Sequence, residues 1–242
     1  MSLAFFTADE RPELRESLSE LVEAWPRFML EDPVAASCFH LLYERFGSLQ
    51  HFLVDTDSGE LVAEVNSVPV AVDLDDLPDR GWDDVLERGT AAAETPTAVS
   101  AIQVLVRPGR YGQGLSALCL RRMRDAAIEH GFDRLVAPVR PTAKARYPLT
   151  PIDRYVRWTN EDGLPFDPWL RVHARLGARI VKPCPQSMTI TGTVAEWEEW
   201  TGMRFPESGA YVVPGALTPV AIDREADLGT YVEPNVWMHH AL

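Results

Sequence analysis

Apolar side chains in residues 11–46 recur every three or four positions, the spacing that puts them on one face of a helix. The positions of this stripe are Leu14, Leu18, Leu21, Val22 and Trp25. Pro26 and Pro33 interrupt the pattern, because proline cannot continue a helix. We expect a second helix from Val34 to Phe46, ended by Gly47. The first part of the chain is therefore predicted to be mostly helical.

Three further apolar runs predict strands, because they are short, rich in β-branched residues and bounded by turn-forming residues. We expect strands at Gln50–Val54 and Leu61–Val72, joined by a hairpin turn at residues 55–59, and a third strand at Val99–Val106. Residues 73–84, between the second and third strands, contain six aspartates. We interpret them as a solvated acidic segment that leads into a short helix.

The third strand leads into a loop that contains two glycines and then into a helix. Gly112 and Gly114 precede this helix, Gly131 ends it, and a short buried strand is expected at Leu135–Val139. The succession is a βαβ unit, in which backbone N–H groups and the positive end of the helix dipole converge on one place. Such a loop binds phosphate without using charged side chains.

Residues 140–168 form an irregular segment that is too long for a plain connection. It either shapes an acceptor pocket or is a packed, salt-bridged surface flap. Its aromatic residues are Tyr147, Tyr155, Trp158 and Phe166, and its arginines are Arg140, Arg146, Arg154 and Arg157. The elements expected after it are a helix at Pro168–Leu176, strands near Ala178–Lys182 and Ser187–Val194, a helix at Ala195–Thr201 and a strand-forming tail.

The composition narrows the class of protein. With 242 residues, 46% of them hydrophobic, we expect one soluble domain over residues 1–242 with a C-terminal extension from about residue 195. The net charge of −13 disfavours nucleic acid and would attract a cationic small molecule, although it also serves solubility. Three separated cysteines and the absence of a membrane-length apolar run predict a cytoplasmic protein with no membrane partner and no metal. A homodimer is compatible with the sequence.

Three classes of phosphate-binding loop compete for the glycine motif. A nucleoside triphosphate loop requires a Gly-Lys-Ser/Thr ending, which is missing here. The NAD(P) fingerprint is matched formally from Gly112 to Ala117, but residues 107–111 separate it from the strand end, where its first glycine should lie. An NAD(P)-binding protein is therefore kept only as a distant alternative.

The run from Val106 to Ser116 resembles the acetyl-CoA motif of GCN5-related N-acetyltransferases, in which a strand, a Pro and Gln/Arg-x-x-Gly-x-Gly/Ala open a helix. Gly112 and Gly114 match, whereas Tyr111 and Ser116 depart from the usual residues. The resemblance implies an α/β fold with a mixed, splayed central sheet flanked by helices, and acetyl-CoA as co-substrate. The cofactor site that it implies consists of Val104, Leu105, Val106, Tyr111, Gly112, Gln113, Gly114, Leu115 and Ser116.

The same resemblance points to His173 as the group that protonates the departing thiolate. The family usually has Tyr at this place, four residues before the glycine of a Leu-Gly pair, here Gly177. Helical spacing puts His173 on the core-facing stripe with Trp169 and Val172. A histidine pKa close to physiological pH would suit this role. Alternatively, His173 is a buried histidine bonded to backbone, with no catalytic role.

Glu64 is the candidate base that accepts the amine proton, directly or through a water molecule. By alternation it shares a strand face with Asn66, while Gln103 is expected only to orient neighbouring groups. A glutamate on a strand also commonly just faces solvent. Together these residues predict N-acetylation of a small amine or amino-acid-like acceptor by direct acyl transfer. The alternative from another class is a non-catalytic module that binds acyl-CoA or an acyl carrier.

Overall fold

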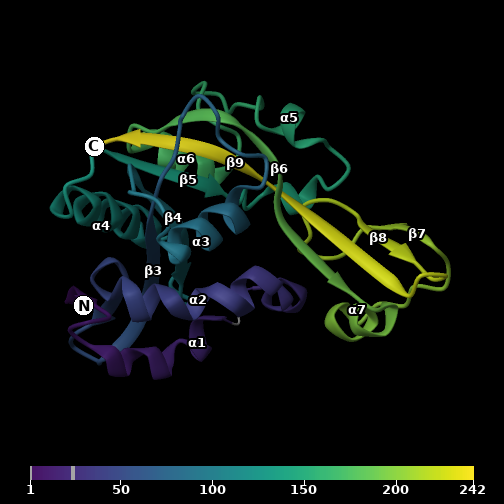
Figure 1. Ribbon diagram of the computed structural model, residues 1–242, viewed down its shortest axis with the longest axis horizontal. Coiled ribbons are helices and arrows are strands. Elements are labelled where there is room, and N and C mark those ends of the chain that lie inside the picture. Colours follow the sequence, from purple (N-terminus) through teal and green to yellow (C-terminus); the bar gives the residue numbers. More distant parts are fainter. Residues whose placement is uncertain (1, 23–24) are drawn as a thin grey trace.

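The computed structural model describes residues 2–22 and 25–242. Within these ranges nine strands form one mixed sheet, in the order β1-β2-β3-β4-β5-β9-β8-β7, with β6 paired to the other edge of β9 (Figure 1). The strands are β1 (Leu3–Thr7), β2 (His51–Asp55), β3 (Glu60–Val70), β4 (Ala98–Val106), β5 (Arg134–Val139), β6 (Arg179–Gly192), β7 (Gly209–Tyr211), β8 (Val220–Asp223) and β9 (Leu228–Ala241).

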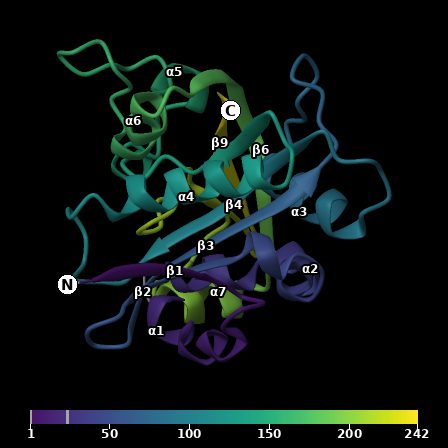
Figure 2. The same ribbon diagram turned by 90° about the vertical axis from the view of Figure 1, so that its left-hand side faces the viewer.

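Helices cover both faces of the sheet (Figure 2). The α-helices are α1 (Ser19–Val22), α2 (Pro33–Arg45), α3 (Gly81–Ala91), α4 (Leu115–Glu129), α5 (Ile152–Tyr155), α6 (Pro168–Arg175) and α7 (Val194–Thr201). The 3₁₀ turns are η1 (Pro12–Ser17), η2 (Arg27–Glu31), η3 (Gly47–Leu49) and η4 (Lys144–Arg146). Helices α4 and α6 pack on one face, and α1, α2 and α3 pack on the other. None of the helices that the structure describes is long and apolar enough to cross a membrane.

The sheet splays between its two central parallel strands. β4 and β5 pair only at Val99↔Leu135 and Ser100↔Val136. Beyond Ser100 the strands diverge, so residues 101–106 keep backbone groups that no β5 residue pairs in the described structure. The predicted mixed, splayed sheet flanked by helices is confirmed.

Two predictions about the strands need correction. No strand was expected before residue 50, yet β1 pairs antiparallel with β2 along the edge of the sheet. A run of five residues is too short to display a period of its own, so its pairing partner defines it. The two strands expected near Ala178–Lys182 and Ser187–Val194 are one long strand, β6, whose register shifts between Cys184 and Met188.

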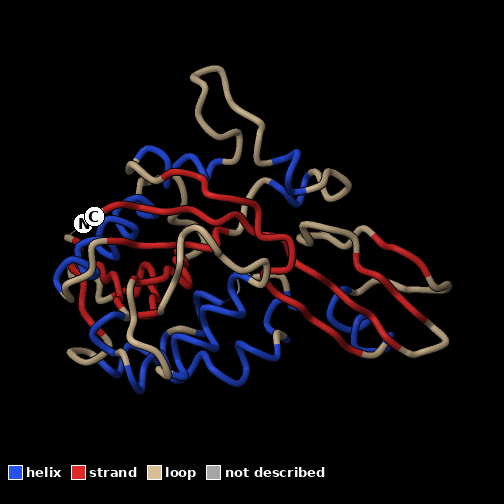
Figure 3. The backbone as a smooth tube through the Cα atoms, turned by 45° about the horizontal axis from the view of Figure 1, so that its top comes forward, coloured by secondary structure: helices blue, strands red, loops and turns tan. Residues whose placement is uncertain are grey.

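The C-terminal part of the sheet projects from the body as an arm (Figures 1 and 3). β6 and β9 run from the body into this arm, where β8 and β7 extend the sheet. A core of its own holds the arm against η2, with Phe28 of η2 in contact with Trp197 of α7 at a ring-centroid distance of 5.6 Å. The predicted extension therefore packs on the N-terminal segment.

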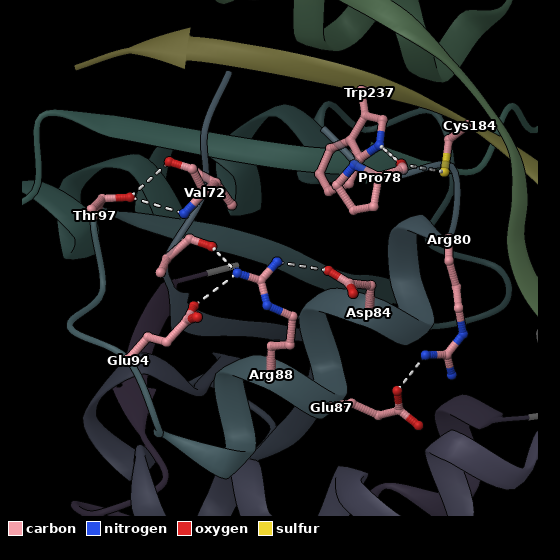
Figure 4. A network of polar contacts seen from close by, with 11 residues as sticks. Val72, Pro78, Arg80, Asp84, Glu87, Arg88, Glu94, Thr97, Cys184 and Trp237 are labelled. Carbon is pink, nitrogen blue, oxygen red and sulfur yellow. Dashed lines mark hydrogen bonds and ion pairs between the residues drawn. The ribbon is translucent and has the colours of Figure 1, made fainter. Parts of the chain in front are cut away.

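The acidic segment before α3 is only partly the solvated surface that we predicted. Trp237 Nε1 donates a hydrogen bond to the Pro78 carbonyl at 2.8 Å, which fixes the segment to β9 (Figure 4). Asp83 in the first turn of α3 is buried, and burial raises the pKa of its carboxyl to about 8. The run of aspartates in the sequence did not indicate that Asp83 is buried, because β6, a strand far away in the sequence, covers it. The Thr189 N–H group of β6 donates to Asp83 at 3.2 Å.

The aromatic residues of the segment 140–168 pack on one another rather than on a pocket. Tyr147, Trp158 and Phe166 form edge-to-face pairs with centroid distances of 5.0 to 5.8 Å. Tyr155 joins them and donates its hydroxyl hydrogen to Asp167, the N-cap of α6, at 3.0 Å. Of the two interpretations, the packed flap describes these aromatic side chains.

Candidate active site

The space between β4 and β5 opens into a cleft of about 1130 Å³. Its lining comes from η1, α1, η2 and α2 on one face of the sheet and from α4 and α6 on the other. Glu64 and His173, which are far apart in the sequence, both line it. The structure thus brings the two predicted catalytic residues to one cavity.

The glycine loop enters α4 through backbone conformations that favour glycine. Gly112 has a φ of 80° and Gly114 a φ of 75°, in the left-handed region. Gly114 is the N-cap of α4 and supplies no side-chain hydrogen bond. The first amides of α4 therefore remain available to an anion, and the helix dipole favours one there.

The predicted cofactor-binding residues differ in how they meet the cleft. Residues 104–106 line it from β4, and Tyr111 and Ser116 line it from the loop and from the first turn of α4. Gln113 is exposed, whereas Leu115 is buried in the core beneath α4. Since its side chain belongs to that core, Leu115 has only its backbone to offer a ligand.

Glu64 lies on β3, directly opposite Leu105 of β4. Its side chain is 2% exposed, so it does not face solvent. Burial raises the pKa of this carboxyl, and hydrogen bonds from its neighbours oppose the rise. A buried carboxylate with a raised pKa at the edge of a cavity has the properties of a proton acceptor.

Polar side chains from three elements hold Glu64. The Tyr43 hydroxyl of α2 donates to Glu64 Oε1, and Gln103 Nε2 of β4 donates to Glu64 Oε2 at 3.0 Å. Asn66 Nδ2 donates to the Tyr43 oxygen at 3.1 Å, and Trp25 Nε1 donates to Gln103 Oε1 at 3.2 Å. Gln103 was expected beside Glu64, whereas Tyr43 and Trp25 were not expected at the site, because these partners meet only in three dimensions.

His173 lies on α6 with its side chain 1% exposed. Its ring packs edge-on against Trp169, with a centroid distance of 4.5 Å. His173 Nδ1 lies 3.0 Å from His240 Nε2 on β9, while His173 Nε2 has no hydrogen-bond partner among the residues that the structure describes. The partner of His173 is thus a second histidine, and not the backbone acceptor that the alternative interpretation assumed.

The pKa of His173 is well below its ordinary value, because burial and the neighbouring His240 both disfavour the charged ring. The expectation of a pKa close to physiological pH is therefore wrong. Helical periodicity placed His173 in the core correctly, but it could not reveal the second histidine on β9. The neutral imidazole retains one N–H donor and one acceptor nitrogen.

A buried ion pair lies in the part of the cleft beside the arm. Arg140 Nε lies 3.0 and 2.9 Å from the two Glu233 oxygens, and Arg140 Nη2 donates to the Gly215 carbonyl at 2.7 Å. Arg140, Glu233 and Asn235 all line the cleft. Glu233 and Asn235 were not expected at the site, because a strand-forming tail carries no motif that marks them.

The adjacent histidines of β9 point in different directions, as expected for a strand. His240 is buried and contacts His173, whereas His239 is partly exposed. Within residues 2–22 and 25–242, no group of three or more His, Cys, Asp and Glu side chains is placed to hold a metal ion.

Comparison with known proteins places this geometry in a family. The chain is 34% identical to the arginine N-acetyltransferase avaD of Aspergillus versicolor, over 98% of this chain and 93% of that protein. The loading GNATL domain of CurA from Lyngbya majuscula superimposes with a TM-score of 0.67 at 18% identity, over 100% of this chain and 98% of that one. The GNAT-like decarboxylase GphF in complex with isobutyryl-CoA gives a TM-score of 0.57 at 16% identity, over 100% and 99% of the two chains. No family model matches the sequence.

The 34% identical relative, together with the splayed sheet, the glycine loop before α4 and the cleft between β4 and β5, identifies an acyl-CoA-dependent N-acetyltransferase. The chain belongs to the GCN5-related N-acetyltransferase superfamily. The resemblance drawn from residues 106–116 is confirmed, and so is an amine-type acceptor. Membership of this family favours the predicted acyl-CoA over the distant NAD(P) alternative.

Proposed function

We propose that the protein transfers an acetyl group from acetyl-CoA to the amino group of a small, cationic, amino-acid-type acceptor such as arginine. The observation that carries this proposal is the position of Glu64, a buried carboxyl that lies opposite Leu105 on the free stretch of β4 and lines the cleft. The arginine named in the relative supports the choice of acceptor.

The acetyl-CoA arm would lie along β4, where β5 pairs no backbone group of residues 101–106. Within this stretch the Ile102 carbonyl already accepts a hydrogen bond from Trp82 Nε1 at 2.9 Å. Its pyrophosphate would rest on the amides that open α4 after Gly112 and Gly114. The thioester carbonyl then lies near residues 104–106, within the cleft that Glu64 and His173 line. These positions follow the family resemblance and the backbone geometry together.

The acceptor would enter from the face covered by η1, η2 and α2. Phe39 supplies an aromatic wall there, and a cation is attracted to aromatic faces. The Trp25 ring already has the Arg140 guanidinium 5.6 Å from its centroid. Glu16 and Arg15 line the same part of the cleft and carry opposite charges, which suits a zwitterion. A guanidinium group stays protonated and is a poor nucleophile, so the α-amino group would be the one acetylated.

The reaction would proceed by direct transfer. The neutral amine attacks the thioester carbon, a C–N bond forms, and the C–S bond breaks with its electron pair left on sulfur. Glu64 would take the proton that the amine nitrogen loses, which its raised pKa favours. Tyr43 and Gln103 hold the two oxygens of this carboxylate in place.

The test measures thiol release from acetyl-CoA with arginine, agmatine, lysine and leucine as acceptors. We expect turnover with arginine and a loss of about 100-fold in kcat/KM in the Glu64→Gln variant, in line with the usual value of a positioned base. Glu44→Gln is the matched control, because Glu44 is exposed on α2 beside Tyr43. Thermal stabilisation by CoA without turnover of any amine would instead support the non-catalytic binding module.

A further inference from the structure

We infer that Trp25 is a positioning residue for Glu64: its indole N–H group fixes the side-chain amide of Gln103, so that the NH₂ group of Gln103 faces the carboxylate. This inference rests on the proposed function, in which Glu64 accepts the proton of the amine. It gives a role to a tryptophan that the sequence placed only on an apolar helical stripe.

The contacts of the Gln103 amide agree on one orientation. Trp25 Nε1 lies 3.2 Å from Gln103 Oε1, and an indole nitrogen can only donate. Gln103 Nε2 lies 3.0 Å from Glu64 Oε2 and 3.3 Å from Asn66 Oδ1, where carboxylate and amide oxygens accept. If the amide were rotated by half a turn, its oxygen would face two acceptors and its NH₂ group would face the indole N–H.

The orientation of the Asn66 amide follows independently from backbone groups. Gln50 Nε2 donates to the carbonyls of Phe46 and Ser67, both at 2.9 Å, so the other end of this amide is the oxygen. Gln50 Oε1 accepts hydrogen bonds from the Ser67 N–H group and from Asn66 Nδ2, each at 3.2 Å. The nitrogen of the Asn66 amide is thereby identified, and its oxygen is the atom that accepts from Gln103.

The two oxygens of Glu64 differ in how their donors are held. The Tyr43 hydroxyl donates to Oε1, and its own oxygen accepts from Asn66 Nδ2 at 3.1 Å, so this side of the network is fixed by the backbone groups around Gln50. On the other side, Gln103 donates to Oε2. Among the residues that the structure describes, the donor to the Gln103 oxygen is Trp25 Nε1. The second donor of Glu64 therefore depends on Trp25.

A fixed donor matters because Glu64 changes its charge when it accepts a proton. Burial raises the pKa of Glu64, and the hydrogen bond from Gln103 is one of those that lower it, because it stabilises the ionised form. Without the Trp25 N–H group, the Gln103 oxygen loses its donor and the amide can rotate away from the carboxylate. The Arg15 guanidinium, 4.4 Å from the Tyr43 ring centroid, is a cation on the other side of the network and is not altered by this change. The pKa of Glu64 should then rise further.

The indole ring is itself held by the C-terminal arm. The Arg140 guanidinium carbon lies 5.6 Å from the Trp25 ring centroid, within the range of a cation–π contact. Arg140 is fixed in turn by Glu233 of β9 and by the Gly215 carbonyl. Gly215 also approaches Pro26, the residue after Trp25, so closely that a Cβ would lie 2.7 Å from Pro26 Cγ. Trp25 therefore connects the carboxylate of Glu64 to the arm.

The first experiment follows the titration of Glu64 without any substrate, by NMR of ¹³C-labelled glutamate side chains, with the Glu64→Gln variant to assign the signal. Trp25→Phe keeps a ring but removes the N–H group. We expect it to move the Glu64 titration up by about one pH unit, since a hydrogen bond to a charged group is worth roughly that shift. An unmoved titration would overturn the inference.

Trp237→Phe is the matched control for this titration. It also removes an indole N–H bond, the one to the Pro78 carbonyl at 2.8 Å, but Trp237 lies outside the lining of the cleft. The Glu64 titration should coincide with that of the wild type. A shift as large as that of Trp25→Phe would mean that the loss of any buried indole bond disturbs Glu64, which would refute the positioning role.

The second experiment tests whether Trp25 acts through Gln103. In a Gln103→Met background the amide is missing, so Trp25→Phe should add almost no further shift to the Glu64 titration. Equal shifts in the two backgrounds would show that Trp25 affects Glu64 by another route, and the inference would be wrong.

The third experiment measures thiol release from acetyl-CoA with arginine across pH. In Trp25→Phe the acidic limb of kcat/KM should move to higher pH, with activity about tenfold lower below the new pKa and the acetyl-CoA KM unchanged. An active variant with the pH profile of the wild type would refute the positioning role. If the wild type acetylates no amine, the proposed function fails, while the two titration experiments still decide whether Trp25 positions the donor of Glu64.

Discussion

The properties of the two catalytic candidates, Glu64 and His173, depend on the side chains that pack against them in the core. Glu64 and His173 could be selected from the sequence, because strand alternation and helical periodicity predict which face a residue occupies. Their partners, Tyr43 and His240, could not be selected, because each comes from an element whose packing no local pattern encodes. The pKa of His173 was misjudged for the same reason, since it depends on that unseen partner.

The Tyr43→Phe substitution removes the Tyr43 hydroxyl without changing the net charge of the protein. It tests whether Glu64 is the proton acceptor. The hydrogen bond from Tyr43 lowers the pKa of Glu64, against the larger effect of burial, which raises it. In Tyr43→Phe the pKa of Glu64 should rise further, so less of it is ionised at a given pH. We expect the acidic limb of the kcat/KM profile to move to higher pH, with activity reduced about tenfold below the new pKa.

Tyr147→Phe provides the comparison for this measurement, since Tyr147 belongs to the aromatic cluster of residues 140–168. Its pH profile should coincide with that of the wild type. A Tyr43→Phe profile with an unmoved acidic limb would mean that Glu64 does not control the limb.

At the scale of elements, the glycine loop and α4 were predicted well because glycine carries its own conformational signal. The strand, loop, helix and strand from Val99 to Val139 appear in the structure nearly where they were expected. The loss of pairing between β4 and β5 after Ser100 has no local signal, and here only the family resemblance predicted it. Neither a local sequence signal nor the family resemblance predicted β1.

Alanine at Gly112 and Gly114 tests whether this turn holds the pyrophosphate. A Cβ meets nothing within 4 Å at either position, so the cost arises from the backbone φ and is about 1–2 kcal/mol per residue. A shift of the loop away from these angles should raise the acetyl-CoA KM about tenfold and change kcat much less. The measurement is initial-rate kinetics with acetyl-CoA as the varied substrate.

Gly131→Ala is the matched control, because Gly131 has a φ of 82° and equally open surroundings after the other end of α4. It should lower stability by a similar amount without raising KM. If the two changes affected KM alike, the loop would have no special part in cofactor binding.

The buried carboxyl of Asp83 makes the stability of α3 depend on pH. Its folded-state pKa of about 8 lies above the ordinary value of an unfolded chain, about 3.9. The folded state therefore favours the protonated carboxyl, and the free energy of unfolding should fall as the pH rises from about 4 to about 8. In Asp83→Asn this contribution should be missing, so urea midpoints at pH 5 and pH 8 should differ less than in the wild type. The same difference in both proteins would show that Asp83 does not titrate in this window.

At the scale of the whole molecule, the arm and the acceptor side of the cleft form one unit. Phe28 of η2 packs on Trp197 of α7 and on Tyr231 of β9, while Trp25 and Met29 beside it line the cleft. The sequence predicted an extension and its strands, but it gave no sign that the extension returns to cover the N-terminal segment. That contact joins segments far apart in the sequence, so the periodicity of apolar residues cannot predict it.

Phe28→Ala tests this coupling. Loss of a fully buried phenylalanine should cost about 3–5 kcal/mol of stability. Because η2 then loses its support, the KM for the amine acceptor should rise about tenfold while CoA binding, measured by calorimetry, stays the same. Phe205→Ala removes a buried ring from the same core outside η2 and should be destabilised without this change in KM. Equal acceptor KM values for the two variants would argue against the coupling.

The position of β9 has a consequence for the order of folding. β9 is synthesised after every other strand of the sheet, yet it lies between β5 and β6 and also pairs with β8. Until residues 228–241 leave the ribosome, the edges of β5 and β6 have no partner, and His173 lacks the histidine beside it. β2 and β3 can pair during synthesis through a short hairpin contact, whereas the half of the cleft that contains His173 must assemble last, through contacts of long sequence separation that form slowly.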